Sequence, residues 1–372
     1  MNDLLRGMML VLTVFLNMCY PAVEGGAWTG INAGWPGADG VWSGIDEAPR
    51  CGDRDPSYAI YQKYRYAYDT YGYLFLYGEE DSGMETGGGP GVNLDAVLTV
   101  IDRNDQGDSA ETDGNTGNLI PALAQLQDYD YLMKHFYSVH ASTTAGRELM
   151  RAEALMGTDL RLTKDALVPQ ILIYHTHSQE TYADYGPGNQ AATVVSVGNY
   201  LAELLEQKGW NVIHDTSTYD IQGGKLDRSR AYNYALDGIT GILQKNPTIQ
   251  VVLDLHRDGV KQGTHLVSEV NGKQTANIMF FQGMSRTPEG VIEYLPNPYL
   301  QENLAFAFQM QYLAAGRYPG FTRKIYLKGL RYNLHLRPRS SLIEVGAQTN
   351  TLQEALNAME PLAELLDTVL HE

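Results

Sequence analysis

Two histidines and a carboxylate follow one apolar run near the middle of the chain, and a further histidine follows a second run. His177 and Glu180 come shortly after residues 171–174, and His256 comes directly after residues 250–255. Continuous apolar runs of this length are typical of strands buried on both faces of a parallel sheet, and ligands bind beyond the carboxyl ends of such strands. Two strands of one sheet can therefore hold His177 and His256 side by side.

The residue types in this set suit a divalent zinc ion. Zinc takes imidazole nitrogens and carboxylate oxygens, and a catalytic site leaves one position open, so His177, Glu180 and His256 are the predicted ligands. His175 competes with His177 for the first place. It lies two residues earlier, on the same side of an extended strand but deeper in the sheet, and we predict that it supports the ligands or contacts substrate.

A zinc hydrolase also needs a group that moves a proton from the attacking water to the leaving nitrogen. Glu344 is the predicted group, because it interrupts the apolar residues 341–347, where an unpartnered buried carboxylate would be costly. The alternative is an ion pair of Glu344 with Arg337 or Arg339. The two histidine motifs elsewhere in the chain favour the catalytic interpretation.

Arg257 directly follows the second ligand motif and is predicted to take part in catalysis. Its guanidinium group could stabilise an oxyanion or bind a peptide carboxylate. The alternative is an ion pair with Asp254 or Asp258. The sequence leaves both interpretations open.

Three polar residues near the end of the chain are candidates for substrate binding. We predict that Arg331 and Asn350 contact the substrate, although Asn350 could instead cap the final helix. His335 is either a substrate residue or a packed one.

The elements that must position these residues alternate between strand and helix from residue 168 onward. This alternation predicts an α/β fold with a mostly parallel sheet flanked by helices. Besides the two strands above, we expect strands over 210–214, 276–282 and 341–345, and helices over 191–208, 229–244, 298–315 and 352–370. A further helix is expected through 148–155.

Composition divides the chain into four predicted parts. Residues 1–26 form a signal peptide or short membrane leader, and an ordinary N-terminal core helix is the alternative. Residues 27–118 are a poorly ordered region rich in Gly, Tyr and Asp, whose Tyr-rich segment 58–68 is either a binding surface or self-packed. Residues 119–167 lead into a catalytic domain over 168–372.

Charge and cysteine content exclude several classes of protein. The formal charge of −17 over 372 residues and the lack of a basic run argue against nucleic-acid binding. Cys19 and Cys51 are too few for a disulfide framework or a cysteine zinc site. A metal must therefore be held by histidines and carboxylates.

Three separated motifs together resemble the stage II sporulation protein P family. They are His177 and Glu180 within 175–180, His256 within 254–259, and Glu344 within 343–351, supported by the segment 326–336. The resemblance spans roughly residues 129–370. The family is similar to the zinc N-acetylmuramoyl-L-alanine amidases, and aligning their strand and Gly-His motif with residues 171–177 favours His177 over His175 as the first ligand.

The chain departs from the amidase pattern at the third ligand. In those amidases the ligand glutamate opens the first long helix, and the corresponding position here is near Gln190, which offers no carboxylate. Glu180 from the preceding loop, or another residue such as Asp184, must take this place.

The resemblance implies a peptidoglycan hydrolase that uses Zn²⁺ to cut the amide between N-acetylmuramic acid and the first L-alanine of the stem peptide. Some members also cut peptide cross-links. It implies action in sporulation and engulfment, outside the cytoplasm on the mother-cell side of the engulfing membranes, exported or membrane-associated, with stage II sporulation proteins D and M as partners. The alternatives are a non-catalytic wall-binding scaffold on an amidase fold and another zinc amide hydrolase, such as a carboxypeptidase or deacetylase.

Overall fold

The computed structural model describes residues 121, 123–185 and 189–371. The predicted leader over 1–26, the Gly-, Tyr- and Asp-rich region over 27–118, and both cysteines lie outside these residues. Within the described ranges, no helix combines the length and the hydropathy that crossing a bilayer requires.

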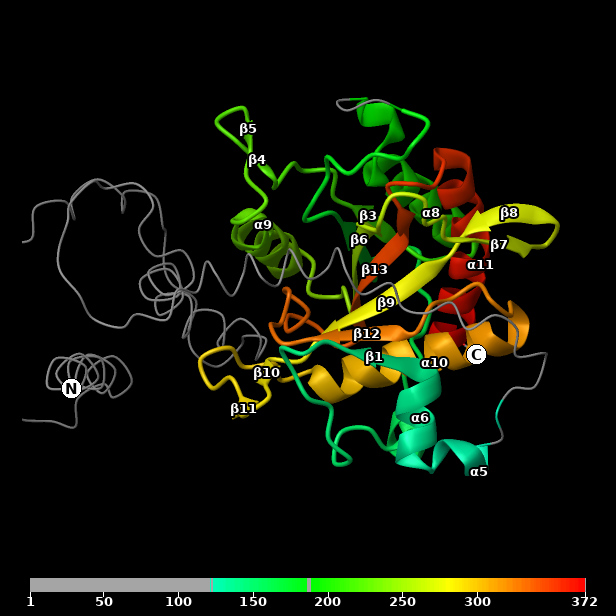
Figure 1. Cartoon of the computed structure of the whole chain (residues 1–372). Helices are drawn as coiled ribbons and strands as arrows, with labels where there is room; N and C mark the ends of the chain where they lie inside the picture. Colours follow the sequence, from blue (N-terminus) through cyan, green and yellow to red (C-terminus); the bar gives the residue numbers. More distant parts are fainter. Residues whose placement is uncertain (1–120, 122, 186–188, 372) are drawn as a thin grey trace, which may run out of the picture. The chain divides into compact units, whose positions relative to one another are not determined.

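Seven strands of the described region form one sheet (Figure 1). Their order across the sheet is β1 (Tyr137–Val139), β12 (Ile325–Lys328), β9 (Ile278–Gly283), β13 (Ser340–Ala347), β6 (Val251–Asp258), β2 (Ile171–Tyr174) and β3 (Val212–His214). Neighbouring strands pair in parallel, except that β9 runs antiparallel to β13. The prediction of a mostly parallel sheet flanked by helices is confirmed.

The antiparallel pair divides the sheet into two blocks of opposite direction. Strands β3, β2, β6 and β13 run one way, whereas β9, β12 and β1 run the other way. At the junction, Val345 near the end of β13 pairs with Ile278 at the start of β9. The carboxyl ends of β2, β6 and β13 therefore share one edge of the sheet with the amino ends of β9 and β12.

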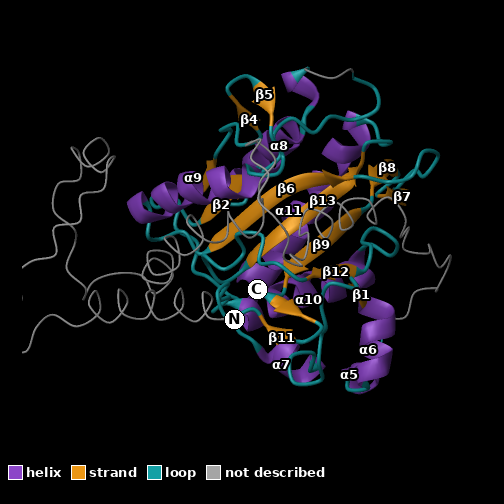
Figure 2. Ribbon diagram, turned by 60° about the vertical axis from the view of Figure 1, so that its left-hand side comes forward, coloured by secondary structure: helices purple, strands orange, loops and turns teal. Residues whose placement is uncertain are grey.

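Helices cover the sheet on both faces (Figure 2). The larger core contains α8 (Val194–Gln207), α10 (Leu300–Arg317) and α11 (Leu352–His371), which pack with every second residue of the central strands. On the other face, α9 (Ala231–Lys245) packs against Leu172 and Val252. Because side chains alternate along a strand, Asp254 and His256 of β6 lie on the α9 side, with Val252.

The helix expected over 191–208 is divided in the structure. A short 3-10 turn (Gln190–Ala192) precedes α8, and each piece has its own N-cap: the side chain of Asn189 accepts from the Ala191 N–H and that of Thr193 from the Val195 N–H. Such caps satisfy backbone donors that the first turn of a helix leaves free. The helix expected through 148–155 is shorter, because Arg151 is extended and α7 (Ala152–Gly157) begins after it.

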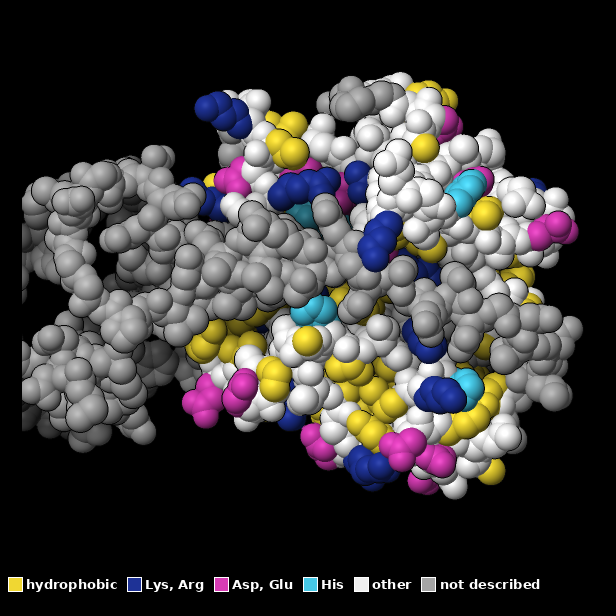
Figure 3. Space-filling model, viewed as in Figure 1, with side chains coloured by type: hydrophobic (Ala, Val, Ile, Leu, Met, Phe, Trp, Pro, Cys, Tyr) yellow, Lys and Arg dark blue, Asp and Glu magenta, His cyan; other side chains and the backbone are white. Residues whose placement is uncertain are grey.

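Several short elements were not predicted from the sequence. Besides β1 and β12, these are the hairpins β4–β5 (Ile221–Gln222 and Lys225–Leu226), β7–β8 (Val267–Val270 and Lys273–Ala276) and β10–β11 (Arg286–Thr287 and Gly290–Val291). The lead-in segment also forms α5 (Leu123–Leu126) and α6 (Tyr129–Phe136). On the face in view in Figure 3, basic and acidic side chains of the described residues are interspersed.

Candidate metal centre

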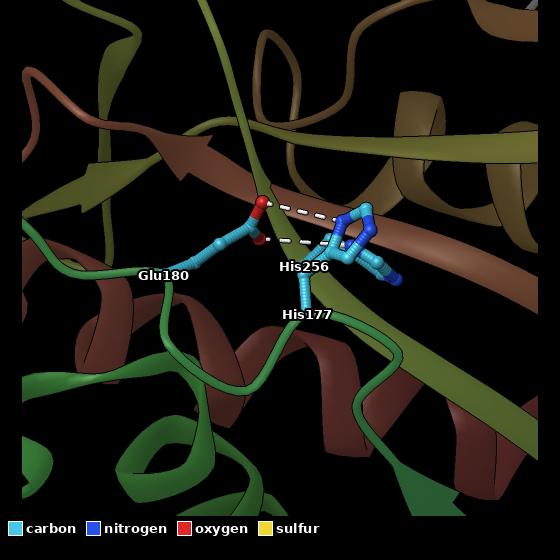
Figure 4. A group of neighbouring side chains, drawn as sticks. All are labelled: His177, Glu180 and His256. Carbon is cyan, nitrogen blue, oxygen red and sulfur yellow. Dashed lines mark ion pairs between the residues drawn. The ribbon is translucent and has the colours of Figure 1, made fainter. Parts of the chain in front are cut away.

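His177, Glu180 and His256 meet at the carboxyl ends of β2 and β6 (Figure 4). One ligand atom from each residue lies within 4.8 Å of the others. The Glu180 carboxylate is directed at both rings: Oε1 is 3.7 Å from Nδ1 of His177, and Oε2 is 3.6 Å from Nδ1 of His256. The structure therefore brings the three predicted ligands together.

The spacing of these atoms fits a shared cation. Tetrahedral zinc with bonds of about 2.0–2.2 Å places its ligand atoms roughly 3.3–3.6 Å apart. The observed 3.6 and 3.7 Å separations are too long for hydrogen bonds and close to that value. Two imidazoles and one carboxylate also match the donor set of catalytic zinc sites. The residues present therefore fit a zinc ion.

The backbone holds Glu180 in this position. Strand β2 ends at Tyr174, and the turn that follows is closed by a hydrogen bond from the Glu180 N–H to the His177 carbonyl. Oε2 of Glu180 accepts a 2.9 Å hydrogen bond from the backbone N–H of Arg257, and Nη2 of Arg228 lies 3.4 Å from Oε1. Glu180 is thus fixed against β6, beside the second histidine.

Charge interactions in this cluster are strong because the groups are buried. Burial raises the pKa of Glu180, but attraction to the His177 and His256 imidazoles outweighs it and leaves that pKa well below its usual value. Burial lowers the pKa of His256, but Asp254 and Glu180 raise it well above its usual value. The cluster therefore favours positive charge between Glu180 and the rings, either a proton or a metal ion.

Glu344 lies beside the cluster on β13. Its Cα is the register partner of the His256 Cα on the neighbouring parallel strand, so both side chains lie on the same face. Burial raises the pKa of Glu344 to about 8, with the Asp258 carboxylate adding to the effect. Arg337 and Arg339, its alternative partners, instead donate hydrogen bonds to the Ile249 and Leu160 carbonyls.

Asp254 and Tyr232 adjoin the cluster, and sequence analysis assigned neither to the site. Asp254 is fully buried, and its Oδ1 lies 2.9 Å from Nε2 of His256. The Tyr232 ring, in the first turn of α9, stacks on His256 at 6.4 Å between centroids and meets His177 edge-on at 5.6 Å. The available signal for Asp254 was an acidic residue two positions before His256, on the same strand face.

His175 follows β2 directly and lies in the protein interior, against α8. It is fully buried, with Nδ1 2.9 Å from the Leu255 carbonyl and Nε2 2.8 Å from Nε2 of His214. On the other side, Nδ1 of His214 is 2.8 Å from Oδ1 of Asn199. The contacts of His175 are thus with the protein interior.

Arg257 and Asp184 hold loops next to the cluster. The Arg257 guanidinium donates to the backbone carbonyls of Thr181 and Asp258, and Asp258 is paired with Arg323. The Asp184 carboxylate accepts from the Leu352 N–H at the start of α11. The structure therefore places Glu180, and not Asp184, between the two histidines.

The three candidates near the end of the chain have contacts with the protein itself. Arg331 donates to the Pro296 carbonyl and packs on Gly283, at the opposite edge of the sheet. Asn350 is fully buried: it accepts from the Ala347 N–H and donates to the Leu266 carbonyl. His335 is also fully buried.

A comparison with protein families matches residues 105–367 to the family described as Stage II sporulation protein P (SpoIIP). The match covers well over half of the chain. The chain belongs to the stage II sporulation protein P family. Among curated relatives, the stage II sporulation protein P of Bacillus subtilis (strain 168) is 25% identical over 210 residues, which are 52% of this chain and 49% of the relative. The chain thus spans about half the length of that family member.

Solved structures of amidases are similar to parts of the chain. The CwlD amidase from Clostridioides difficile, in complex with the GerS lipoprotein, is 13% identical with a TM-score of 0.35, over 54% of this chain and 98% of that one. The N-acetylmuramyl-L-alanine amidase Ami1 from Mycobacterium abscessus is 14% identical with a TM-score of 0.31, over 54% and 99%.

Proposed function

We propose that the chain is a zinc-dependent N-acetylmuramoyl-L-alanine amidase that hydrolyses peptidoglycan. The observation that carries the proposal is the convergence of His177, Glu180 and His256 with Glu344 beside them, in a member of this family. Two imidazoles, a carboxylate and a separate, largely buried acid are the parts that a zinc hydrolase uses to cut an unactivated amide. The bond cut would be that between N-acetylmuramic acid and the first L-alanine of the stem peptide.

His177, Glu180 and His256 would hold the metal ion. When bound, zinc would supply Lewis acidity, which polarises the scissile carbonyl and lowers the pKa of bound water to about 7. The chain's own part is to keep these three donors fixed: Glu180 through the Arg257 N–H, and the histidines through the ends of two paired strands.

Glu344 would carry the proton. In the carboxylate form it accepts a proton from the attacking water, and in the acid form it donates that proton to the departing amine nitrogen. Burial raises its pKa to about 8, so that both forms are accessible near neutral pH. A carboxyl group with an ordinary pKa would be almost fully ionised near neutral pH and would seldom hold the proton that the leaving nitrogen needs.

Family membership extends the proposal to location and partners. We propose action in sporulation and engulfment, outside the cytoplasm on the mother-cell side of the engulfing membranes, with stage II sporulation proteins D and M. Cleavage of peptide cross-links would be a second activity of the same centre.

The proposal predicts that the zinc-loaded chain releases stem peptides that begin with alanine from purified peptidoglycan, leaving intact glycan. Glu344→Gln should lower the rate about 100- to 10,000-fold, because it removes the proton carrier. Its zinc content should stay unchanged, since Glu344 is not one of the predicted ligands. Mass spectrometry of the products and metal analysis check both statements.

Other outcomes would redirect the assignment. If the only bonds cut lie within the stem peptide, the chain would be assigned as a peptidase and not as an amidase. A loaded chain that binds peptidoglycan without product release would instead be a wall-binding scaffold.

A further inference from the structure

One carboxylate outside the predicted ligand set contacts both segments that carry the histidine ligands. Asp254 lies within β6 and is fully buried. Its Oδ1 accepts a 2.9 Å hydrogen bond from the Thr176 N–H, and its Oδ2 accepts a 2.6 Å hydrogen bond from the Thr176 hydroxyl. Thr176 directly precedes His177, so these bonds fix the start of the first ligand segment.

The same carboxylate also contacts the second ligand. Oδ1 of Asp254 lies 2.9 Å from Nε2 of His256. The ring N–H is not well aligned with that oxygen, so the contact is a close electrostatic one between the carboxylate and the imidazole. The opposite nitrogen of the ring, Nδ1, faces Glu180 at 3.6 Å.

We propose that Asp254 is a positioning residue that sets which nitrogen of His256 binds the metal and holds His256 in register with His177. Accepting the Nε2–H of His256 leaves Nδ1 with a free lone pair toward Glu180. The bonds to Thr176 fix His177 relative to the same carboxylate. This inference rests on the proposed function, because it takes the cluster to bind zinc.

A purely structural role for Asp254 makes different predictions. A carboxylate that only satisfies Thr176 would leave the choice of His256 nitrogen and the zinc affinity unaffected. Asp220 offers the comparison: it is fully buried too, and it holds the same loop by accepting from the Ser178 hydroxyl and the Gln179 N–H. The contacts of Asp220 are with the residues between His177 and Glu180.

The first experiment measures zinc affinity of the full chain by competition with a chromogenic chelator. Asp254→Asn should weaken zinc binding by about 10- to 100-fold, as is usual for the carboxylate partner of a ligand histidine. Asp220→Asn should weaken it by no more than about threefold, since its partners carry no ligand ring. Equal affinities of the two variants would overturn the proposal.

The second experiment uses the wild-type chain, so it does not depend on a variant that folds. Magnetic resonance of the cadmium-substituted protein with isotope-labelled histidine shows which ring nitrogen is coupled to the metal. We expect Nδ1 of His256, and coupling through Nε2 would refute the role of Asp254. A chain that binds neither metal would refute the zinc proposal itself, whereas metal binding without amide hydrolysis would refute only the activity.

Discussion

Two pairs of histidines in this molecule have nearly the same ring geometry but different surroundings. The ring centroids of His177 and His256 lie 5.0 Å apart with an angle of 84° between the ring planes. Those of His175 and His214 lie 5.1 Å apart with an angle of 78°. In the first pair, the Glu180 carboxylate lies against both rings. In the second pair, the two Nε2 atoms are 2.8 Å apart and bond to each other directly.

The difference lies in charge. Carboxylates raise the pKa of His256 well above its usual value, whereas burial lowers the pKa of His175 to about 3 and that of His214 to about 4. The second pair is therefore neutral, and its nitrogens already satisfy each other. The comparison teaches that a carboxylate placed between two rings, and not the ring geometry itself, marks the candidate metal centre.

The largest expected effect comes from removing one histidine of each pair. His256→Ala should weaken zinc binding by more than about 100-fold, because it deletes a ligand. His214→Ala should keep zinc affinity close to wild type and lose only stability, since it leaves Nε2 of His175 without its partner. Metal analysis after dialysis measures the first effect and denaturant unfolding the second. Equal zinc loss in both variants would contradict the comparison.

A smaller effect is expected from crowding the neutral pair. A Cβ at Gly198 of α8 would lie 2.7 Å from ring atoms of both His175 and His214. Gly198→Ala should therefore lower the free energy of unfolding by about 1–3 kcal/mol. Gly241→Ala in α9 is the matched control: nothing lies within 4 Å of its added Cβ, so helix propensity should stabilise by roughly 0.5–1 kcal/mol. Thermal unfolding of the two variants measures this difference. Equal changes in the unfolding temperature of both variants would contradict it.

A further effect, of comparable size, is a pH dependence of stability that His214 contributes. Its pKa is about 4 in the folded chain, lowered by burial from 6.5, so the unfolded chain binds more protons between these values. This contribution is complete above pH 6.5 and is lost as the pH falls toward 4, at up to about 1.4 kcal/mol per pH unit. His214→Asn should flatten the fall in unfolding free energy between pH 6.5 and 5 in chelator-treated protein. An unchanged slope would assign the dependence to other groups.

The sequence predicts the parallel half of the sheet well, because β2, β6 and β13 are mainly apolar runs in which only a few polar residues occur. It does not predict the direction of β9, since Met279 and Phe281 alternate with Ile278 and Phe280 in the same way in a parallel or an antiparallel neighbour. Strands β1 and β12 were missed because each is short and mixes a polar residue, Ser138 or Lys328, into its apolar run, whereas the equally short β2 is apolar throughout.

The sequence identifies candidate site residues by their chemical type, but it does not show which way their side chains point. His177, Glu180 and His256 combine zinc-binding chemistry with strand ends, so residue type and spacing were enough. Arg257 was assigned to catalysis, yet it follows His256 directly along a strand, and its guanidinium is bonded to the Thr181 carbonyl. Asp254 was considered only as a partner for Arg257, because its contact with Thr176 joins residues far apart in sequence.

Among the strands of the described residues, β13 is the last to be made, and it lies in the middle of the sheet, between β6 and β9. Until it emerges from the ribosome, β6 and β9 each present an unpaired edge, and the two blocks of strands have no connection through the sheet. Folding of this region must therefore wait until β13 has been synthesised, which delays the sheet relative to the strands that precede it. A nascent or truncated chain that ends before residue 340 would keep the strands of the metal ligands but lack the one that joins them to the rest.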